Sequence, residues 1–266
     1  QEISDRHGVS RASVREALSL ALDRDGLIQA RELLGGHGLK GLSPIPPGSW
    51  AHNDKLPAPV FDPQKAASVL DEAGWVDGDG DEIRDRDGQP LHVTLSVRGD
   101  SPLLVDMAAA IQKGWRAIGI QVDVQEIQGA NLAATLGTRA FSALLFSIEL
   151  PYYDPDPYAL WHSTQIAAPG QNYAGFSSPE ADQLLVDGRR AHPVLGQPER
   201  RQLYERFQEI FAEELPALII AYPAYTYVVA DPTIGNVQLP SLVVQPADRF
   251  LSLPDWYART ERVFRR

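Results

Sequence analysis

Aromatic and acidic side chains that could hold a polar organic molecule gather in residues 143–185. An apolar run at 143–148 precedes two aspartates separated by one proline, and a second polar segment follows. Proteins place such side chains on loops at the end of a buried strand, where they capture a ligand without covalent chemistry. The predicted ligand-binding residues are Glu149, Tyr152, Tyr153, Asp154, Asp156, Tyr158, Trp161, Asn172 and Tyr173.

Two roles are open for the four aromatic side chains Tyr152, Tyr153, Tyr158 and Trp161. They could stack on a sugar or an apolar side chain, or support a cation by cation–π contact. Each could equally well pack the wall of the site. The residue types alone do not separate these roles.

Enzyme and cofactor motifs are missing from the sequence. The chain has no cysteine, which excludes disulfides, thiolate catalysis and cysteine-ligated metals. Its six histidines are not at metal-ligand spacing, and it has neither a phosphate-binding P-loop nor a G-x-S-x-G nucleophile motif. We predict no catalytic residue, no metal and no cofactor. A hydrolase using Asp154 or Asp156 is a minor alternative, which predicts turnover that the Asp154→Asn variant would lose.

The acidic stretch 77–88 resembles a calcium-binding EF-hand loop only in part. Asp77, Asp79 and Asp81 occupy its first three ligand positions. Glu82 stands where the loop needs glycine, and Gly88 stands where it needs the closing glutamate. Because aspartate and glycine also form turns readily, we predict a turn without metal.

Composition predicts a globular protein with an acidic surface. The 266 residues are 44% hydrophobic and 22% charged, with a net charge of −11. That charge disfavours attraction to nucleic acid and to anionic lipid. The sequence has no run of 18 apolar residues that could span a membrane as a helix, and residues 1–18 are too polar for a signal peptide. We therefore expect that processing removed an export signal or that the sequence is a fragment.

Hydrophobic periodicity predicts helices that alternate with strands. Gly35-Gly36 ends the first helical pattern, and Asp62 with Pro63 begins the second. Alternating elements of this kind favour an α/β sandwich. The predicted helices are 11–34, 62–75, 103–117, 131–138, 179–191 and 197–214, and the predicted strands are 91–97, 120–125, 141–148, 218–222 and 225–230.

The N-terminal residues 2–28 resemble the recognition part of GntR-type winged-helix repressors. Gly8 would lie in the turn, and Ser10, Arg11 and Ser13 at the start of the next helix could meet phosphates and base edges. The first helix of that domain and its basic β-wing have no counterpart here. A DNA-binding regulator with a ligand-sensing domain is the alternative function.

A longer resemblance runs from Val14 to the strand after Pro216. The chain is similar to the solute-binding proteins of peptide and nickel ABC importers, the family-5 extracellular binding proteins. Its motifs follow the order of that family over most of the chain. They are 14–24 (VREALSLALDR), 43–47 (SPIPP), 61–91, 118–122 (IGIQV), 154–156 (DPD), 172–173 (NY), 179–182 (PEAD), 201–204 (RQLY) and 214–217 (ELPA).

This resemblance implies an α/β lobe of the type II periplasmic-binding-protein kind, with a mixed sheet flanked by helices. Residues 14–218 would form most of the second lobe, and residues 219–266 the crossover strands and a tail returning toward the first lobe. Residues 1–13 have no firm assignment. The first lobe, expected upstream of Val14, is absent from this sequence. A single lobe cannot close over its ligand, so tight capture should suffer.

The resemblance also implies a function and its partners. The chain would be part of a non-enzymatic, monomeric protein that captures a peptide or similar small polar solute and delivers it to a membrane permease. Its place would be periplasmic or extracellular and membrane-associated, with no nucleic-acid partner. Peptide-binding members carry an aspartate shortly before the Asp-Pro pair that anchors the ligand's ammonium group. Pro151 takes that position here, and Glu149 is the nearest substitute.

Overall fold

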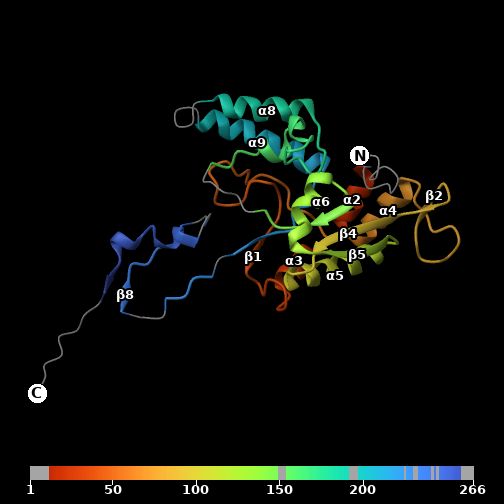
Figure 1. The fold of residues 1–266 in the computed structure, drawn as a ribbon, viewed down its shortest axis with the longest axis horizontal. Coiled ribbons are helices and arrows are strands. Elements are labelled where there is room, and N and C mark those ends of the chain that lie inside the picture. The colour runs from red at the N-terminus through yellow and green to blue at the C-terminus, as the bar shows by residue number, and fades with distance from the viewer. Residues whose placement is uncertain are drawn as a thin grey trace, which may run out of the picture.

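The described chain consists of an α/β body, a helical hairpin beside it and an extended C-terminal segment (Figure 1). A computed structural model of the protein describes residues 12–148, 154–191, 197–224, 226–229, 233–240, 243 and 246–258. Within these ranges the predicted alternation of helices and strands is confirmed. The result is a mixed α/β protein whose sheets include both parallel and antiparallel pairs.

Three parallel strands form the sheet of the α/β body, in the order β5-β4-β6. Strand β4 (His92–Arg98) is the central strand and pairs with both neighbours. Its apolar side chains Val93, Leu95 and Val97 are all buried. Helix α5 (Pro102–Arg116) makes the crossover from β4 to β5 (Gln121–Ile127). Strand β6 (Ala143–Leu145) is shorter than the predicted 141–148, since only three of its residues pair with β4.

The remaining strands form short antiparallel pairs. Strand β1 pairs with β7, β2 with β3, and β8 with β9. No strand lies in the described residues 226–229, so the predicted strand at 225–230 is not found there, and the predicted strand at 218–222 is shifted to β7. The bounds are β1 (Gly38–Lys40), β2 (Asp85–Arg86), β3 (Gln89–Pro90), β7 (Ala221–Pro223), β8 (Ile234–Gly235) and β9 (Tyr257–Ala258).

The predicted helix at 11–34 is two helices. Asp23 interrupts it, because its carboxylate accepts a hydrogen bond of 2.8 Å from the Gly26 amide and begins a new helix. The other predicted helices are found close to their predicted ranges, whereas the short helix at Tyr158–Trp161 was not predicted. The bounds are α2 (Ala12–Leu20), α3 (Arg24–Gln29), α4 (Pro63–Glu72), α6 (Leu132–Thr138), α7 (Tyr158–Trp161), α8 (Pro179–Arg190) and α9 (Gln197–Glu214), with 3₁₀ turns η1 (Gly129–Asn131), η2 (Ser163–Gln165), η3 (Pro246–Phe250) and η4 (Leu253–Asp255).

Among the described residues, apolar side chains form two main cores and a small third cluster of Ile45, Ala51 and Tyr204. The larger core lies between the sheet, α5 and the packed pair α2 and α4. The smaller core lies between α7, α8 and α9, and its ring contacts include Trp161 edge-on to Phe211 with centroids 4.7 Å apart. The side chains of the smaller core are Trp161, Phe176, Ala181, Leu185, Phe207, Ile210 and Phe211. The hairpin α8–α9 is therefore a packing unit distinct from the α/β body.

Arginines from the first helices connect the two units. Arg15 donates hydrogen bonds to the carbonyls of Glu214 and Leu215, which lie at the end of α9. Arg24, which is 4% exposed, donates from Nε to the Ile219 carbonyl at 2.9 Å. Burial lowers the pKa of Arg24 to about 10. Both contacts satisfy carbonyls that a helix end or a crossing segment leaves unpaired.

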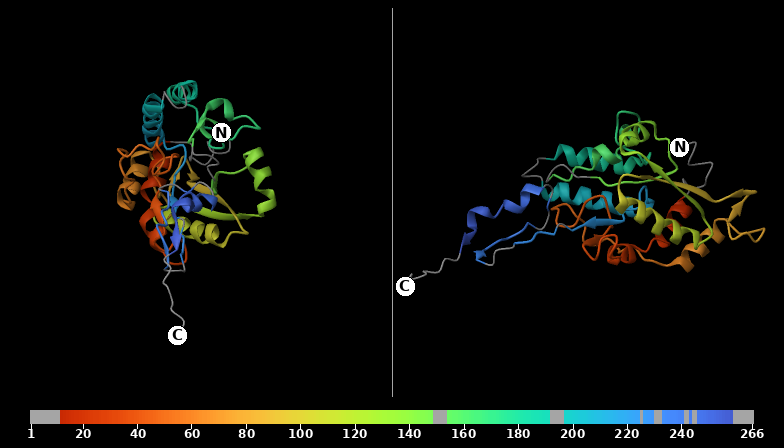
Figure 2. Two further views of the ribbon diagram at one scale, coloured as in Figure 1. Left: turned by 90° about the vertical axis from the view of Figure 1, so that its left-hand side faces the viewer. Right: turned by 60° about the horizontal axis from the view of Figure 1, so that its bottom comes forward.

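The C-terminal segment leaves the body after β7 and extends away from it, as Figure 1 and the right-hand view of Figure 2 show. Just before β7 the chain passes close to the residue after β1, and glycine is required there, because a Cβ atom at Gly41 would lie 2.4 Å from the Ile219 carbonyl oxygen. Farther out the segment exposes apolar side chains that no described residue covers. The most exposed are Val228, Leu251, Leu253 and Tyr257, at 77%, 61%, 51% and 51%.

The packing of α8 on α9 predicts a sharp effect at Gly188. A Cβ atom there would lie 2.5 Å from Cε1 of the fully buried Tyr204 ring, which cannot move aside. We expect Gly188→Ala to lower the free energy of unfolding in urea by about 2 kcal/mol through overpacking. The matched control is Gly137→Ala in α6, where a Cβ meets nothing within 4 Å. It should raise stability by up to about 1 kcal/mol. Equal effects of the two substitutions would contradict the close packing of α8 on α9.

Candidate ligand-binding site

The carboxyl ends of the three parallel strands meet at one edge of the sheet. They end at Arg98, Ile127 and Leu145. The chain runs from β4 to β5 on one side and then crosses back past β4 to β6 on the other side. Ligands of open α/β sheets bind outside the carboxyl ends of strands, where the strand order changes direction. This edge is therefore the candidate ligand-binding site, and the loops after β4 and β6 supply its side chains.

An aromatic pair lies directly beyond β6. Phe146 follows the strand, and its ring meets that of Tyr173 edge-on with centroids 6.1 Å apart. The guanidinium of Arg139 lies 5.8 Å from the Tyr173 ring and donates to the Gly170 carbonyl at 3.1 Å. The structure thus brings the predicted Tyr173 to the end of β6, together with a cation that sequence reasoning missed.

The two aspartates of the Asp-Pro-Asp turn face arginines of the helical hairpin. Both carboxylate oxygens of Asp154 accept hydrogen bonds from Arg200 Nη2, at 2.9 and 3.1 Å. Asp156 Oδ2 accepts from Arg189 Nε at 2.6 Å. A carboxylate paired in this way has less capacity left for a solute. The predicted role of these two residues as solute contacts stays a prediction.

Tyr158 is enclosed on both faces of its ring. The Arg189 guanidinium lies 3.9 Å from the ring centroid, and His162 stacks on the ring at 4.2 Å. The Tyr158 hydroxyl is 3.2 Å from Thr164 Oγ1. These contacts fix the ring and leave its hydroxyl end as the part that could meet a solute.

Trp161 and Asn172 lie in the interior, at 6% and 0% exposure. The Asn172 side chain donates to the carbonyls of His162 and Phe176, and it accepts from the Phe176 amide at 3.0 Å. Trp161 packs in the smaller core, and its indole N–H has no hydrogen-bond partner among the described residues. For both side chains the contacts favour a structural role, because burial leaves little surface for a solute.

The other predicted residues, Glu149, Tyr152 and Tyr153, lie outside the described residues, as does Pro151.

Sequence reasoning also missed a charged pair at the end of β4. Arg98 Nε donates to Asp100 Oδ1 at 2.7 Å. The hydrogen bond from Arg98 lowers the pKa of Asp100. Arg98 is the last residue of a strand with alternating apolar side chains and Asp100 follows that strand, and this position was the available signal.

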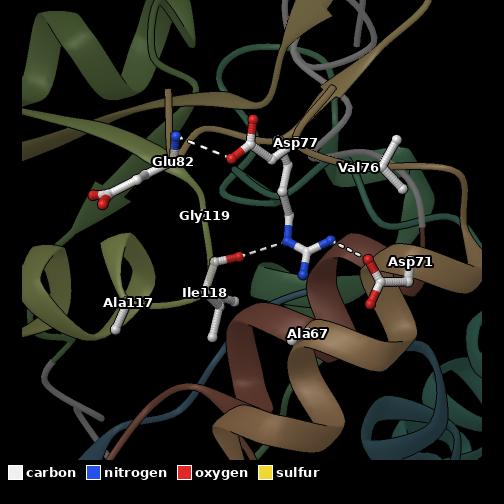
Figure 3. A pocket seen from close by; sticks show the side chains of 9 residues that line it. Ala67, Asp71, Val76, Asp77, Glu82, Ala117, Ile118 and Gly119 are labelled. Carbon is white, nitrogen blue, oxygen red and sulfur yellow. Dashed lines mark hydrogen bonds and ion pairs between the residues drawn. The ribbon is translucent and has the colours of Figure 1, made fainter. Parts of the chain in front are cut away.

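A hollow lies at the opposite edge of the sheet (Figure 3). It is a cavity of about 390 Å³ between α4, the turn at 76–82 and the residues that precede β5. Arg84 spans its floor, donating from Nε to the Ile118 carbonyl at 2.8 Å and forming an ion pair with Asp71. The lining residues are Ala67, Asp71, Val76, Asp77, Glu82, Arg84, Ala117, Ile118 and Gly119. Its position at the amino edge makes it the weaker candidate.

Beside this cavity lie the three aspartates of the partial EF-hand pattern. The carboxylates of Asp77, Asp79 and Asp81 come close enough together to share a cation. Each of them also accepts a hydrogen bond from a main-chain amide of the same turn, for example Asp77 from Gly80 at 2.7 Å. These bonds explain the acidic composition as turn chemistry. The predicted absence of a metal here stays a prediction.

Comparison with known proteins gives a consistent result. The family model of bacterial extracellular solute-binding proteins, family 5 Middle, matches residues 6–168. The oligopeptide-binding protein AppA of Bacillus subtilis is 32% identical over 79% of the chain, and the nickel-binding periplasmic protein of Escherichia coli is 30% identical over 85%. The solved structure of AppA in complex with a nonapeptide superimposes on 94% of the chain and 48% of its own, with 26% identity and a TM-score of 0.75.

The chain spans 38% and 42% of the lengths of these two relatives. The structural match confirms the predicted type II periplasmic-binding-protein fold. The DNA-binding alternative gains no support, because most of residues 2–28 falls inside the region that the solute-binding model matches. Within the described part of the chain, no helix is both long and apolar enough to cross a bilayer.

The contacts of Asn172 predict its contribution to stability. Asn172→Ala should lower the free energy of unfolding in urea by about 2 kcal/mol, because it leaves the buried carbonyl and amide of Phe176 unpaired and removes one of the two hydrogen bonds to the His162 carbonyl. The control is Gln183→Ala, whose amide reaches only Asp187 on the exposed face of α8. It should change stability by less than about 0.5 kcal/mol. A loss below that size for Asn172→Ala would mean that this side chain is not needed for the fold.

Proposed function

The chain belongs to family 5 of the bacterial extracellular solute-binding proteins, and we propose that it forms one wall of a cleft that captures a peptide or similar polar solute. The observation that carries this proposal is the family match across the α/β body, whose parallel strands end at the candidate site. Binding without chemical turnover is the activity expected of such a wall, so we propose no enzyme activity.

The wall that we propose has apolar and charged parts. Phe146 and Tyr173 offer an aromatic surface beyond β6, and Arg98 with Asp100 offers both charges beyond β4. Aromatic and charged groups together suit a peptide, which has apolar side chains and two charged ends. The predicted residues Glu149, Tyr152 and Tyr153 precede Asp154 in the sequence and belong to the same proposed wall.

We propose the domain division 14–218 for the second lobe and 219–266 for crossover strands and a tail, with residues 1–13 left unassigned. Support comes from the antiparallel pair β1–β7, where the chain crosses out of the α/β body. Further support comes from the exposed apolar side chains beyond it, such as Val228 and Leu251. An apolar surface of this kind favours contact with another protein surface, and a first lobe is the occupant we propose.

The proposed partners follow from the family. The B. subtilis relative is an oligopeptide-binding protein and the E. coli relative is a nickel-binding periplasmic protein. For this chain we propose a peptide solute, delivery to an ABC permease, a monomeric state and a periplasmic or extracellular, membrane-associated location, with no nucleic-acid partner. A nickel complex is the second candidate solute, supported by the 30% identity to the nickel-binding relative.

Binding tests this function when both walls are present. We would place the first lobe of the B. subtilis relative ahead of the chain and titrate the product with peptides from dipeptide to nonapeptide and with Ni²⁺. Calorimetry should detect peptide binding at least about tenfold tighter than to the chain alone, because closure buries the ligand on two sides. If the two-lobed protein folds and binds neither peptide nor Ni²⁺, the proposed function is wrong.

Single substitutions in the two-lobed protein locate the wall. Tyr173→Ala should weaken peptide binding about tenfold, since it removes half of the aromatic pair beyond β6. The control Val76→Ala removes an exposed apolar side chain at the opposite edge of the sheet and should leave affinity unchanged. Equal affinity of the two variants would remove Tyr173 from the site.

A further inference from the structure

The Asp-Pro-Asp turn is attached at both of its acidic residues to the helical hairpin. Asp154 pairs with Arg200 of α9, and Asp156 pairs with Arg189 of α8. The two arginines come from different helices, so the turn spans the hairpin.

Neutral contacts of the hairpin hold Arg200 in place independently of Asp154. Its Nε donates to the Gly188 carbonyl at 2.8 Å, its Nη2 donates to the Tyr204 hydroxyl at 3.2 Å, and its guanidinium lies 5.2 Å from the Trp50 ring centroid. Burial opposes the charged form, but the hydrogen bonds with Tyr204 and Asp154 outweigh it and raise the pKa of Arg200. The Arg200 side chain is 6% exposed and that of Asp154 is 51% exposed. The hairpin thus holds Arg200 in place, and Arg200 in turn holds Asp154.

The second ion pair orders the start of α7. Asp156 uses Oδ2 for Arg189 and Oδ1 for the Tyr158 amide, at 2.6 and 3.1 Å. The same Arg189 guanidinium covers the Tyr158 ring. One side chain of α8 therefore fixes both the carboxylate and the ring that begin the helix.

We propose that Arg189 and Arg200 are positioning residues for residues 154–161, which form the Asp-Pro-Asp turn and α7 in the proposed solute-binding wall. They need not touch solute; they hold Asp154 and Asp156, and Arg189 also holds the Tyr158 ring, whose hydroxyl end could meet a solute. It follows that the α8–α9 hairpin sets the position of this turn and so affects solute binding. This inference rests on the proposed function for its consequence in binding, but not for the attachment itself.

Hydrogen–deuterium exchange of the 266-residue chain tests the attachment without any ligand. Arg189→Met should speed amide exchange in residues 154–161 at least about tenfold, because it releases the turn that fixes the amides of Tyr158 and Trp161. The matched control is Arg190→Met, whose side chain is 74% exposed and pairs with Asp187 on α8. Arg189→Lys keeps the charge and should restore most of the protection.

The buried partner needs a milder variant, because Arg200→Met removes a side chain from the interior. Asp154→Asn changes only the half-exposed partner and should also speed exchange in residues 154–161. The inference is wrong if Arg189→Met and Asp154→Asn exchange in this segment at the same rate as Arg190→Met. Faster exchange spread over the whole chain would also count against it, since it would mean global destabilisation.

Peptide affinity of the two-lobed protein tests the consequence. Arg189→Met should weaken binding of the peptide that the wild-type protein binds best by at least about threefold, and Arg190→Met should not change it. Faster amide exchange in residues 154–161 with unchanged peptide affinity would contradict the proposed effect of the hairpin on solute binding. If the wild-type two-lobed protein binds no peptide and no Ni²⁺, the proposed function is wrong. Hydrogen–deuterium exchange would still test whether the hairpin holds the Asp-Pro-Asp turn.

Discussion

The buried guanidinium of Arg200 must find its compensation inside the protein, and this constraint organises the half of the molecule around the helical hairpin. A buried charge is costly unless it is paired and hydrogen-bonded. Here the Gly188 carbonyl, the Tyr204 hydroxyl and the Asp154 carboxylate meet it. Those partners belong to α8, α9 and the turn before α7. Satisfying one cation therefore brings three segments together.

A similar principle connects the hairpin to the α/β body. Arg15 and Arg24 donate to carbonyls at the end of α9 and in the segment that crosses to β7. Arg139 does the same for the loop before α8, where it meets the Gly170 carbonyl. The main cores of the two units are separate, and a small cluster packs Ile45 and Ala51 against Tyr204 of α9, so these directed contacts help to define how the units are oriented. Hydrogen bonds suit this task because they depend on direction, whereas apolar packing does not.

The same contacts change the meaning of the acidic and aromatic residues that first drew attention to this region. A carboxylate in a loop is available to a solute only if no closer cation takes it. Asp154 and Asp156 have arginines within 3 Å, and Asn172 uses its amide for the loop itself. Phe146, Arg98 and Arg139 have less distinctive sequence surroundings, yet they lie at or near the ends of the strands that form the candidate site. Where a residue lies relative to the sheet is therefore as informative about solute binding as its residue type.

The sequence by itself determined the α/β class, most helices and the two long strands, because helical and strand periodicities and caps such as Asp62 are local properties. The ordered motifs also determined the family, now confirmed by its match. The partners of each side chain were decided only by the tertiary structure. Arg200 and Asp154 are 46 residues apart, and Arg15 and Leu215 are 200 apart. No local pattern encodes such pairs, since they form only when packing of the hairpin and the sheet brings distant segments within hydrogen-bond distance.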